Sequence, residues 1–149
     1  MSTESNVAGV NAAGIGVNNL VTPGKPIAYS CAVTGANTSY TDTPANAVEL
    51  VPAQALGCRL TKITALARAT NTATELQLFV SSDSGTTKRF VDSALMAAYT
   101  VAQTTRQAKT AFGLSEQDPL ILAAGESLYA CIGVANTGIV FRAEGGAYV

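Results

Sequence analysis

The chain of 149 residues contains no histidine, the side chain that proteins use most often as a general base and as a metal ligand. Within one chain this excludes Ser-His-Asp and Cys-His catalysis as well as histidine-containing zinc sites. Tryptophan is also absent, and aromatic residues make up only 6% of the chain. Clefts that bind sugars are usually lined by such rings. We therefore expect no metal ion, no cofactor and no enzymatic activity.

Charge is scarce too, since only 13% of the residues are charged and the formal net charge is -1. Nucleic acids and anionic membranes are bound by clustered lysine and arginine, and the sequence has no basic run. No apolar run approaches the roughly 18 residues of a membrane span, and the first residues lack the basic and apolar regions of a signal peptide. We expect neither a nucleic-acid nor a membrane partner, and a protein made and kept in a cytoplasm.

Cysteine occurs three times, as Cys31, Cys58 and Cys131, without Cys-x-x-Cys spacing. An odd number of widely separated cysteines fits neither a zinc site nor a disulfide framework. Each lies among apolar neighbours, which predicts small buried side chains.

The abundant residues are small or β-branched: 26 alanines, 18 threonines, 13 valines and 13 glycines. Threonine and valine favour strands, and few stretches have the apolar spacing of a helix. The length predicts one domain. A surface with so few charges favours a subunit of a larger assembly.

The first 26 residues differ from the rest, because isolated apolar residues stand among serine, asparagine, glycine and alanine. They follow neither a strand period nor a helix period, and the turn-forming residues 23–26 end the segment. We predict an extended N-terminal arm at residues 1–26 and a single domain at residues 27–149. About 25 extended residues span up to roughly 85 Å, enough to reach a neighbouring subunit. The predicted partner-binding residues of the arm are Val7, Val10, Ile15, Val17, Leu20 and Val21.

The domain is predicted to be all-β: an antiparallel β-sandwich, jelly-roll-like, with about eight strands. Leu76, Leu78 and Val80 alternate with polar residues, which predicts a strand that returns at residues 88–92 as a hairpin. Residues 92–102 fit either a strand or a helical turn, and Gly145-Gly146 is expected to form a terminal bend. The other predicted strands are 27–33, 47–51 at an edge before Pro52, 58–69 with a bulge, 107–112, 120–126, and a second hairpin of 127–134 with 139–144.

The carboxylates give no local catalytic pattern. They fall in predicted turns or at strand ends, where solvated acids are expected: Asp83, Asp92, Glu116, Asp118, Glu126 and Glu144. Glycoside hydrolysis needs only two carboxyl groups at a set distance, so a glycosidase stays an alternative.

Three segments carry a family resemblance: the hairpin 76–80 with 88–91, the run 120–128, and the ending 143–148. Over residues 57–148 the sequence resembles the head decoration (cement) proteins of tailed bacteriophages and related jelly-roll virion subunits. The resemblance implies a β-sandwich that assembles, often as a homotrimer, on the outer surface of an icosahedral head. There it would bind the major capsid protein and clamp neighbouring capsomers. It does not extend to the arm.

Two other non-enzymatic functions stay open on the sequence. One is an adaptor of the neck, tail or fibre of the same virion, and the other is a carbohydrate-binding module. Both use the same fold with a different partner, so the residues alone do not separate them.

Overall fold

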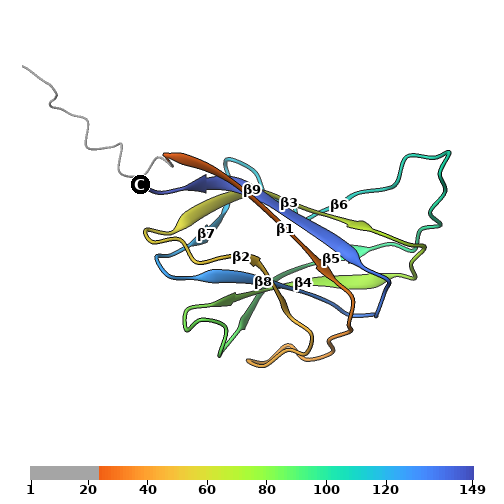
Figure 1. Ribbon diagram of the computed structural model, residues 1–149, viewed down its shortest axis with the longest axis horizontal. Helices are drawn as coiled ribbons and strands as arrows, with labels where there is room; N and C mark the ends of the chain where they lie inside the picture. The colour runs from red at the N-terminus through yellow and green to blue at the C-terminus, as the bar shows by residue number, and fades with distance from the viewer. Residues whose placement is uncertain (1–23) are drawn as a thin grey trace, which may run out of the picture.

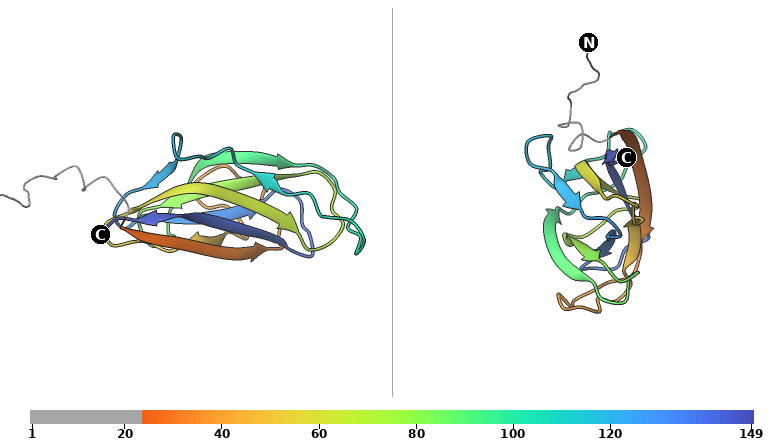
Figure 2. Two further views of the ribbon diagram at one scale, coloured as in Figure 1. Left: turned by 90° about the horizontal axis from the view of Figure 1, so that it is seen from above. Right: turned by 90° about the vertical axis from the view of Figure 1, so that its left-hand side faces the viewer.

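The computed structural model describes residues 24–149, which form two antiparallel sheets packed face to face and no helix (Figures 1 and 2). The six predicted binding residues of the arm lie outside the described residues. The strands are β1 (Lys25–Val33), β2 (Val48–Val51), β3 (Cys58–Ala67), β4 (Thr74–Ser81), β5 (Arg89–Met96), β6 (Thr110–Ala111), β7 (Leu120–Leu122), β8 (Ser127–Ile132) and β9 (Ile139–Ala147).

Sheet A has the order β1-β9-β3-β6, with β7 also paired to β3, and sheet B has the order β2-β8-β4-β5. The chain crosses from one sheet to the other after β1, β2, β3, β5, β7 and β8. The short strands β6 and β7 lie one after the other along the same side of β3. Two four-position sheets connected in this way form a jelly roll, so the predicted all-β, jelly-roll-like sandwich is confirmed.

The core lies between the sheets and follows the alternation of the strands. Leu76 and Leu78 of β4 are fully buried there with Val80 packed beside them, as predicted. In β3 the pairing register shifts between Leu60 and Lys62, which is the predicted bulge. The shift lets Leu60 and Ile63 both face the core although three positions separate them.

Several boundaries differ from the prediction. Strand β1 begins at Lys25, so residues 25 and 26 pair with β9. The ambiguous segment continues β5 to Met96, and the strand expected at 107–112 reduces to β6. Gly145-Gly146 lies inside β9 and is not a bend.

The second predicted hairpin is wrong. Strand β8 pairs in sheet B with β2 and β4, whereas β9 pairs in sheet A with β1 and β3. The turn residues 136–138 therefore carry the chain from one sheet to the other. An Asn-Thr-Gly turn between two apolar strands is compatible with either connection, because which sheet the next strand joins depends on long-range packing.

Candidate binding surface

The loop of residues 34–47, between β1 and β2, lies on the outer face of sheet B and is held there by Asn37. The Asn37 side chain is 1% exposed, and its Nδ2 donates hydrogen bonds of 2.8 Å to Gln77 Oε1 and Ser39 O. Its Oδ1 accepts from the backbone N–H groups of Ser39 (3.2 Å) and Ala45 (2.8 Å). Because the whole amide group is paired, the loop is a fixed part of this face.

Three neighbouring aromatic rings lie beside this loop, and they range from fully buried to exposed. The Tyr40 ring centroid lies 4.9 Å from that of Phe90 in β5, which in turn lies 5.3 Å from that of Phe79 in β4. Phe79 is fully buried, whereas Phe90 is 37% and Tyr40 54% exposed. Tyr40 Oη donates a 2.5 Å hydrogen bond to Glu75 Oε1, and this bond raises the pKa of Tyr40 because it favours the protonated phenol.

Further exposed apolar residues stand along β5, with Asp92, Ser93 and Ala94 between Val91 and Leu95. The register pairs Phe90 with Phe79 and Leu95 with Glu75, so Phe90 and Leu95 point to the outer face of sheet B. Val91 is 45% and Leu95 70% exposed. We call Tyr40, Phe90, Val91 and Leu95 the β5 rim. In the described part of the chain β5 pairs only with β4, so the rim borders an open sheet edge.

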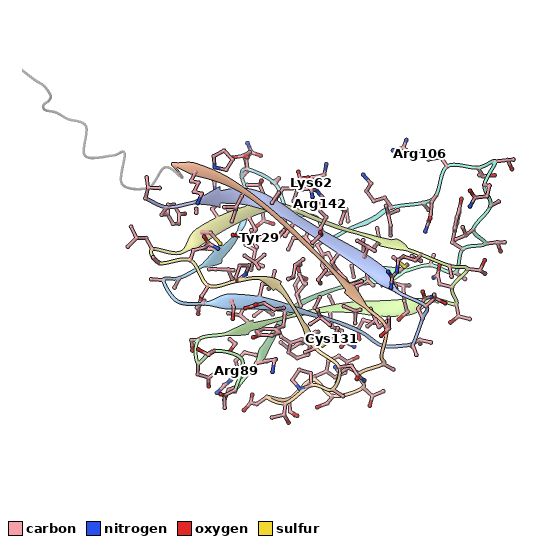
Figure 3. All side chains as sticks on the ribbon, viewed as in Figure 1. Tyr29, Lys62, Arg89, Arg106, Cys131 and Arg142 are labelled. Atoms are coloured by element: carbon pink, nitrogen blue, oxygen red, sulfur yellow. The ribbon has the colours of Figure 1, made fainter. Side chains whose placement is uncertain are left out.

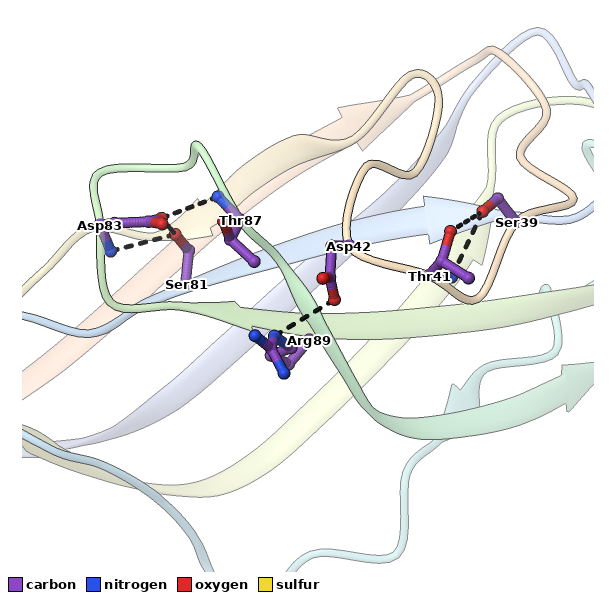
Figure 4. A network of polar contacts seen from close by, with 7 residues as sticks. All are labelled: Ser39, Thr41, Asp42, Ser81, Asp83, Thr87 and Arg89. Carbon is purple, nitrogen blue, oxygen red and sulfur yellow. Dashed lines mark hydrogen bonds and ion pairs between the residues drawn. The ribbon is translucent and has the colours of Figure 1, made fainter.

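Two basic residues beside the β5 rim, Lys88 and Arg89, contact the 34–47 loop and fix its position. Arg89 Nε lies 3.2 Å from Asp42 Oδ1, which ties the start of β5 to the 34–47 loop (Figure 4). Lys88 donates its backbone N–H to Asp42 O at 2.9 Å, and its Nζ lies 4.9 Å from the centroid of the Tyr129 ring. Exposed pairs of this kind contribute little free energy, so they set geometry more than stability.

The turn between β4 and β5 is ordered by Asp83 (Figure 4). Its Oδ1 accepts 2.8 Å hydrogen bonds from the Thr87 backbone N–H and from Ser81 Oγ. These bonds, chiefly the one from Thr87, lower the pKa of Asp83 because they favour the ionised carboxylate. The predicted solvated turn acid therefore has a structural role.

All three cysteines are free thiols, and Cys58 and Cys131 are fully buried, as predicted. Cys31 is half-buried against the core. Burial raises the pKa of Cys31 to about 12 and the pKa values of Cys58 and Cys131 to about 11. Since the thiolate is the reactive form, none of them is suited to nucleophilic chemistry near neutral pH.

Two hollows lie at opposite ends of the sandwich. A cavity of about 400 Å³ lies between the end of β5 and β6, and Leu95, Met96, Asn71 and Gln107 are among its walls. A groove of about 720 Å³ lies beside the start of β1. Its lining includes charged side chains: Arg59 and Glu116 pair at 3.5 Å, and Glu144 lies beside them in the lining.

The outer face of sheet A carries charges of both signs. Lys62 and Arg142 project from it on neighbouring strands (Figure 3). Arg142 Nε donates a 2.8 Å hydrogen bond to Glu144 Oε2, which lowers the pKa of Glu144. This pair and the Arg59–Glu116 pair place two of the predicted acids beside arginines.

No group of three or more histidine, cysteine, aspartate or glutamate side chains that could hold a metal ion occurs within residues 24–149. The same residues contain no helix long and apolar enough to cross a membrane.

The binding residues predicted from the sequence are all in the arm, and none of the β5 rim residues was among them. Tyr40 stands in a stretch rich in threonine, asparagine and aspartate, and it is 55 positions away from Leu95. One signal was present: the adjacent apolar residues Phe90 and Val91 break the alternation expected of a half-buried strand. Comparison of the chain with models of known protein families and with curated proteins gives no match.

Proposed function

We propose that the protein is a non-enzymatic structural subunit of a tailed-phage virion, a decoration (cement) protein that binds the assembled head. The observation that carries the proposal is the β5 rim. Three apolar side chains of the edge strand β5 and the ring of Tyr40 in the adjacent loop are each more than one-third exposed. An apolar surface of this kind on a rigid scaffold is typical of a protein that functions in contact with another protein.

The mechanism requires binding and no chemical step. A protein that binds the assembled shell, and not its separated subunits, adds its binding free energy to the stability of the shell. Many copies on one head make a modest contact large in sum. In this proposal the partner is the major capsid protein, the subunit acts as a homotrimer, and it is added to the head surface in the host cytoplasm.

The test is binding to purified, empty, expanded heads. Val91→Asp places a carboxylate in the β5 rim at a position that is 45% exposed in the free protein. If the rim is desolvated on the head, the variant should bind at least about tenfold more weakly, because an unpaired charge is costly to bury. The matched control is Leu56→Asp, at a loop position that is 59% exposed and remote from the rim.

Stoichiometric, saturable binding of the wild type and the Leu56→Asp variant, with loss in Val91→Asp, is the expected result. Equal binding of all three proteins would remove the rim from the mechanism. Binding to purified tails and not to heads would replace the proposal by a neck or tail adaptor. Binding to a glycan array, with no binding to particles, would favour a carbohydrate-binding module.

A further inference from the structure

Strand β5 has an unpaired edge, because among residues 24–149 it pairs only with β4. An unpaired strand presents backbone N–H and C=O groups to which a strand of another molecule can add. The exposed apolar side chains of β5, Phe90, Val91 and Leu95, would favour such addition. Two copies of the chain would then meet edge to edge, with the same strand of each copy at the contact. The details of β5 therefore decide whether copies of the protein pair in this way.

The hydrogen bonds of β4 show which backbone groups of β5 point away from sheet B. Glu75 O accepts a hydrogen bond of 2.8 Å from the N–H group of Gly133, the residue after β8. Successive residues of a strand direct their N–H and C=O groups to alternate neighbours, so the groups of Leu76 point to β5. The partner of Leu76 in β8 agrees, because Ile132 O accepts a 2.8 Å hydrogen bond from Asn37 N–H, on the side away from β4.

This alternation identifies the groups at the free edge. In β5 the partner of Leu76 is Ala94, so the N–H and C=O groups of Ala94 face β4. Those of its neighbours Ser93 and Leu95 therefore face out of the sheet. In a two-fold pairing of two β5 strands, Ser93 of one copy would lie opposite Leu95 of the other, and the two residues would exchange both hydrogen bonds. Each exchange requires the N–H group of Ser93.

The N–H group of Ser93 is already occupied. It donates a hydrogen bond of 2.8 Å to Oδ1 of Asp92, the preceding residue. Asp92 pairs with the fully buried Leu78, so its side chain leaves the strand on the core face of sheet B. Charged side chains directed inward at a sheet edge are one means by which proteins keep edge strands unpaired. A strand added to β5 would displace the carboxylate from Ser93 and leave it without a partner at the junction, which is costly.

A β-bulge interrupts the same edge. The pairing with β4 passes from Phe90 to Asp92, so Val91 is the extra residue. A bulge bends its strand and disrupts regular pairing at that point. The regular part of the edge is therefore limited to residues 92–96. Pairing with another strand would depend on this short segment, in which Asp92 occupies one of the outward N–H groups.

We propose that Asp92 prevents the β5 edge from pairing with β5 of a second copy. Its carboxylate accepts the outward N–H group that a paired strand would need, and it places a charge where the two sheets would join. The β5 rim then stays accessible and is contacted through its side chains. The inference goes beyond the proposed function, because it concerns the free protein and holds whichever partner the rim binds.

The first test compares two full-length variants without phage particles. Asp92→Ala removes the carboxylate from a half-buried position at the margin of the sheet, so the core stays intact. Sedimentation velocity should show that this variant self-associates at least about tenfold more tightly than the wild type. The matched control is Asp118→Ala, the same substitution at an exposed loop position. It changes the net charge equally and should associate as the wild type does.

A second variant places the contact at the backbone of Ser93. Ser93→Pro removes the outward N–H group, which β4 does not use, and proline is tolerated at such positions of edge strands. Combined with Asp92→Ala, it should return self-association to the wild-type level. Hydrogen exchange locates the contact independently. The outward amide of Leu95 should exchange more slowly as the concentration of Asp92→Ala rises, and this change should be absent in the double variant.

Four results would each overturn the inference. They are equal self-association of the wild type and Asp92→Ala, equal self-association of Asp92→Ala and Asp118→Ala, tight association that persists in the double variant, and fast exchange of the Leu95 amide in associated Asp92→Ala. The last result would show that the contact lies elsewhere. Because no head is present, failure of the protein to bind heads would leave these outcomes unchanged.

Discussion

At Gly145, β9 passes so close to β3 that there is no room for a methyl group. A Cβ atom built on Gly145 would lie 1.9 Å from Arg59 O and 2.8 Å from Leu60 Cα. These are backbone atoms at the β3 bulge, where Leu60 pairs with Gly145 and the register shifts. The bulge and the glycine therefore form one unit, since the bulged strand needs a neighbour without a side chain.

Replacing Gly145 by alanine should destabilise the protein by about 3 kcal/mol or more, because backbone atoms on both strands must move apart. Urea unfolding measures this as a lower midpoint with an unchanged slope. The control is Gly133→Ala, whose Cβ would lie 3.6 Å from its nearest neighbours, an ordinary contact. Equal midpoints for the two variants would contradict the close crossing.

Among the connecting segments, the 34–47 loop depends most on one side chain. Asn37 joins the loop to itself through Ser39 and Ala45, and to β4 through Gln77. Tyr40 of the β5 rim belongs to the same loop, so the position of its ring depends on Asn37. The rim is thus supported by a buried amide pair.

Asn37→Ala should cost about 2–4 kcal/mol, because it leaves Gln77 and two loop N–H groups without their partners. Native-state hydrogen exchange should show faster exchange of the Ala45 and Lys88 amides, both of which bond within this unit. Thr38→Ala, at the exposed neighbouring position, is the control. If exchange at Ala45 stays slow in Asn37→Ala, another contact holds the loop.

The strands that the sequence predicted well are those with a local signal. The alternation of β4, the hairpin β4–β5, the bulge in β3 and the edge position of β2 before Pro52 were all visible in the residues. The placement of β8 and β9 in different sheets was not visible, because the same turn residues can form a hairpin within one sheet or a crossover between two sheets. The strand predicted at 107–112 was overestimated, since only Thr110 and Ala111 pair with β3, although β3 continues to Ala67.

The binding surface was harder to predict than the fold for a related reason. The β5 rim joins a loop residue, Tyr40, to an edge strand, and only the register brings Phe90 beside Phe79 and Leu95 beside Glu75. A single sequence contains the apolar residues but not the fact that, among residues 24–149, β5 has no second neighbour in the sheet. The cavity at Asn71 likewise appears only when β5 and β6 come together at facing edges.

For the molecule as a whole, low charge and open edges favour assembly. With a formal net charge of -1, copies of the chain repel one another weakly, so apolar contacts are not opposed at long range. The two hollows lie at opposite ends of the sandwich. In the proposed assembly, the β5 rim would bind the head.

Deleting residues 1–22 should leave the domain folded and weaken its binding to heads. The buried core is built from side chains between Ile27 and Ala147, so the thermal unfolding temperature should change by only a few degrees. Head binding should fall because six apolar arm residues, Val7, Val10, Ile15, Val17, Leu20 and Val21, are lost together with any subunit contacts they make. Sedimentation of the full-length and shortened proteins with expanded heads compares their affinities. A shortened protein that binds as tightly as the full chain would show that the arm has no part in attachment and that the folded domain alone supplies the contact.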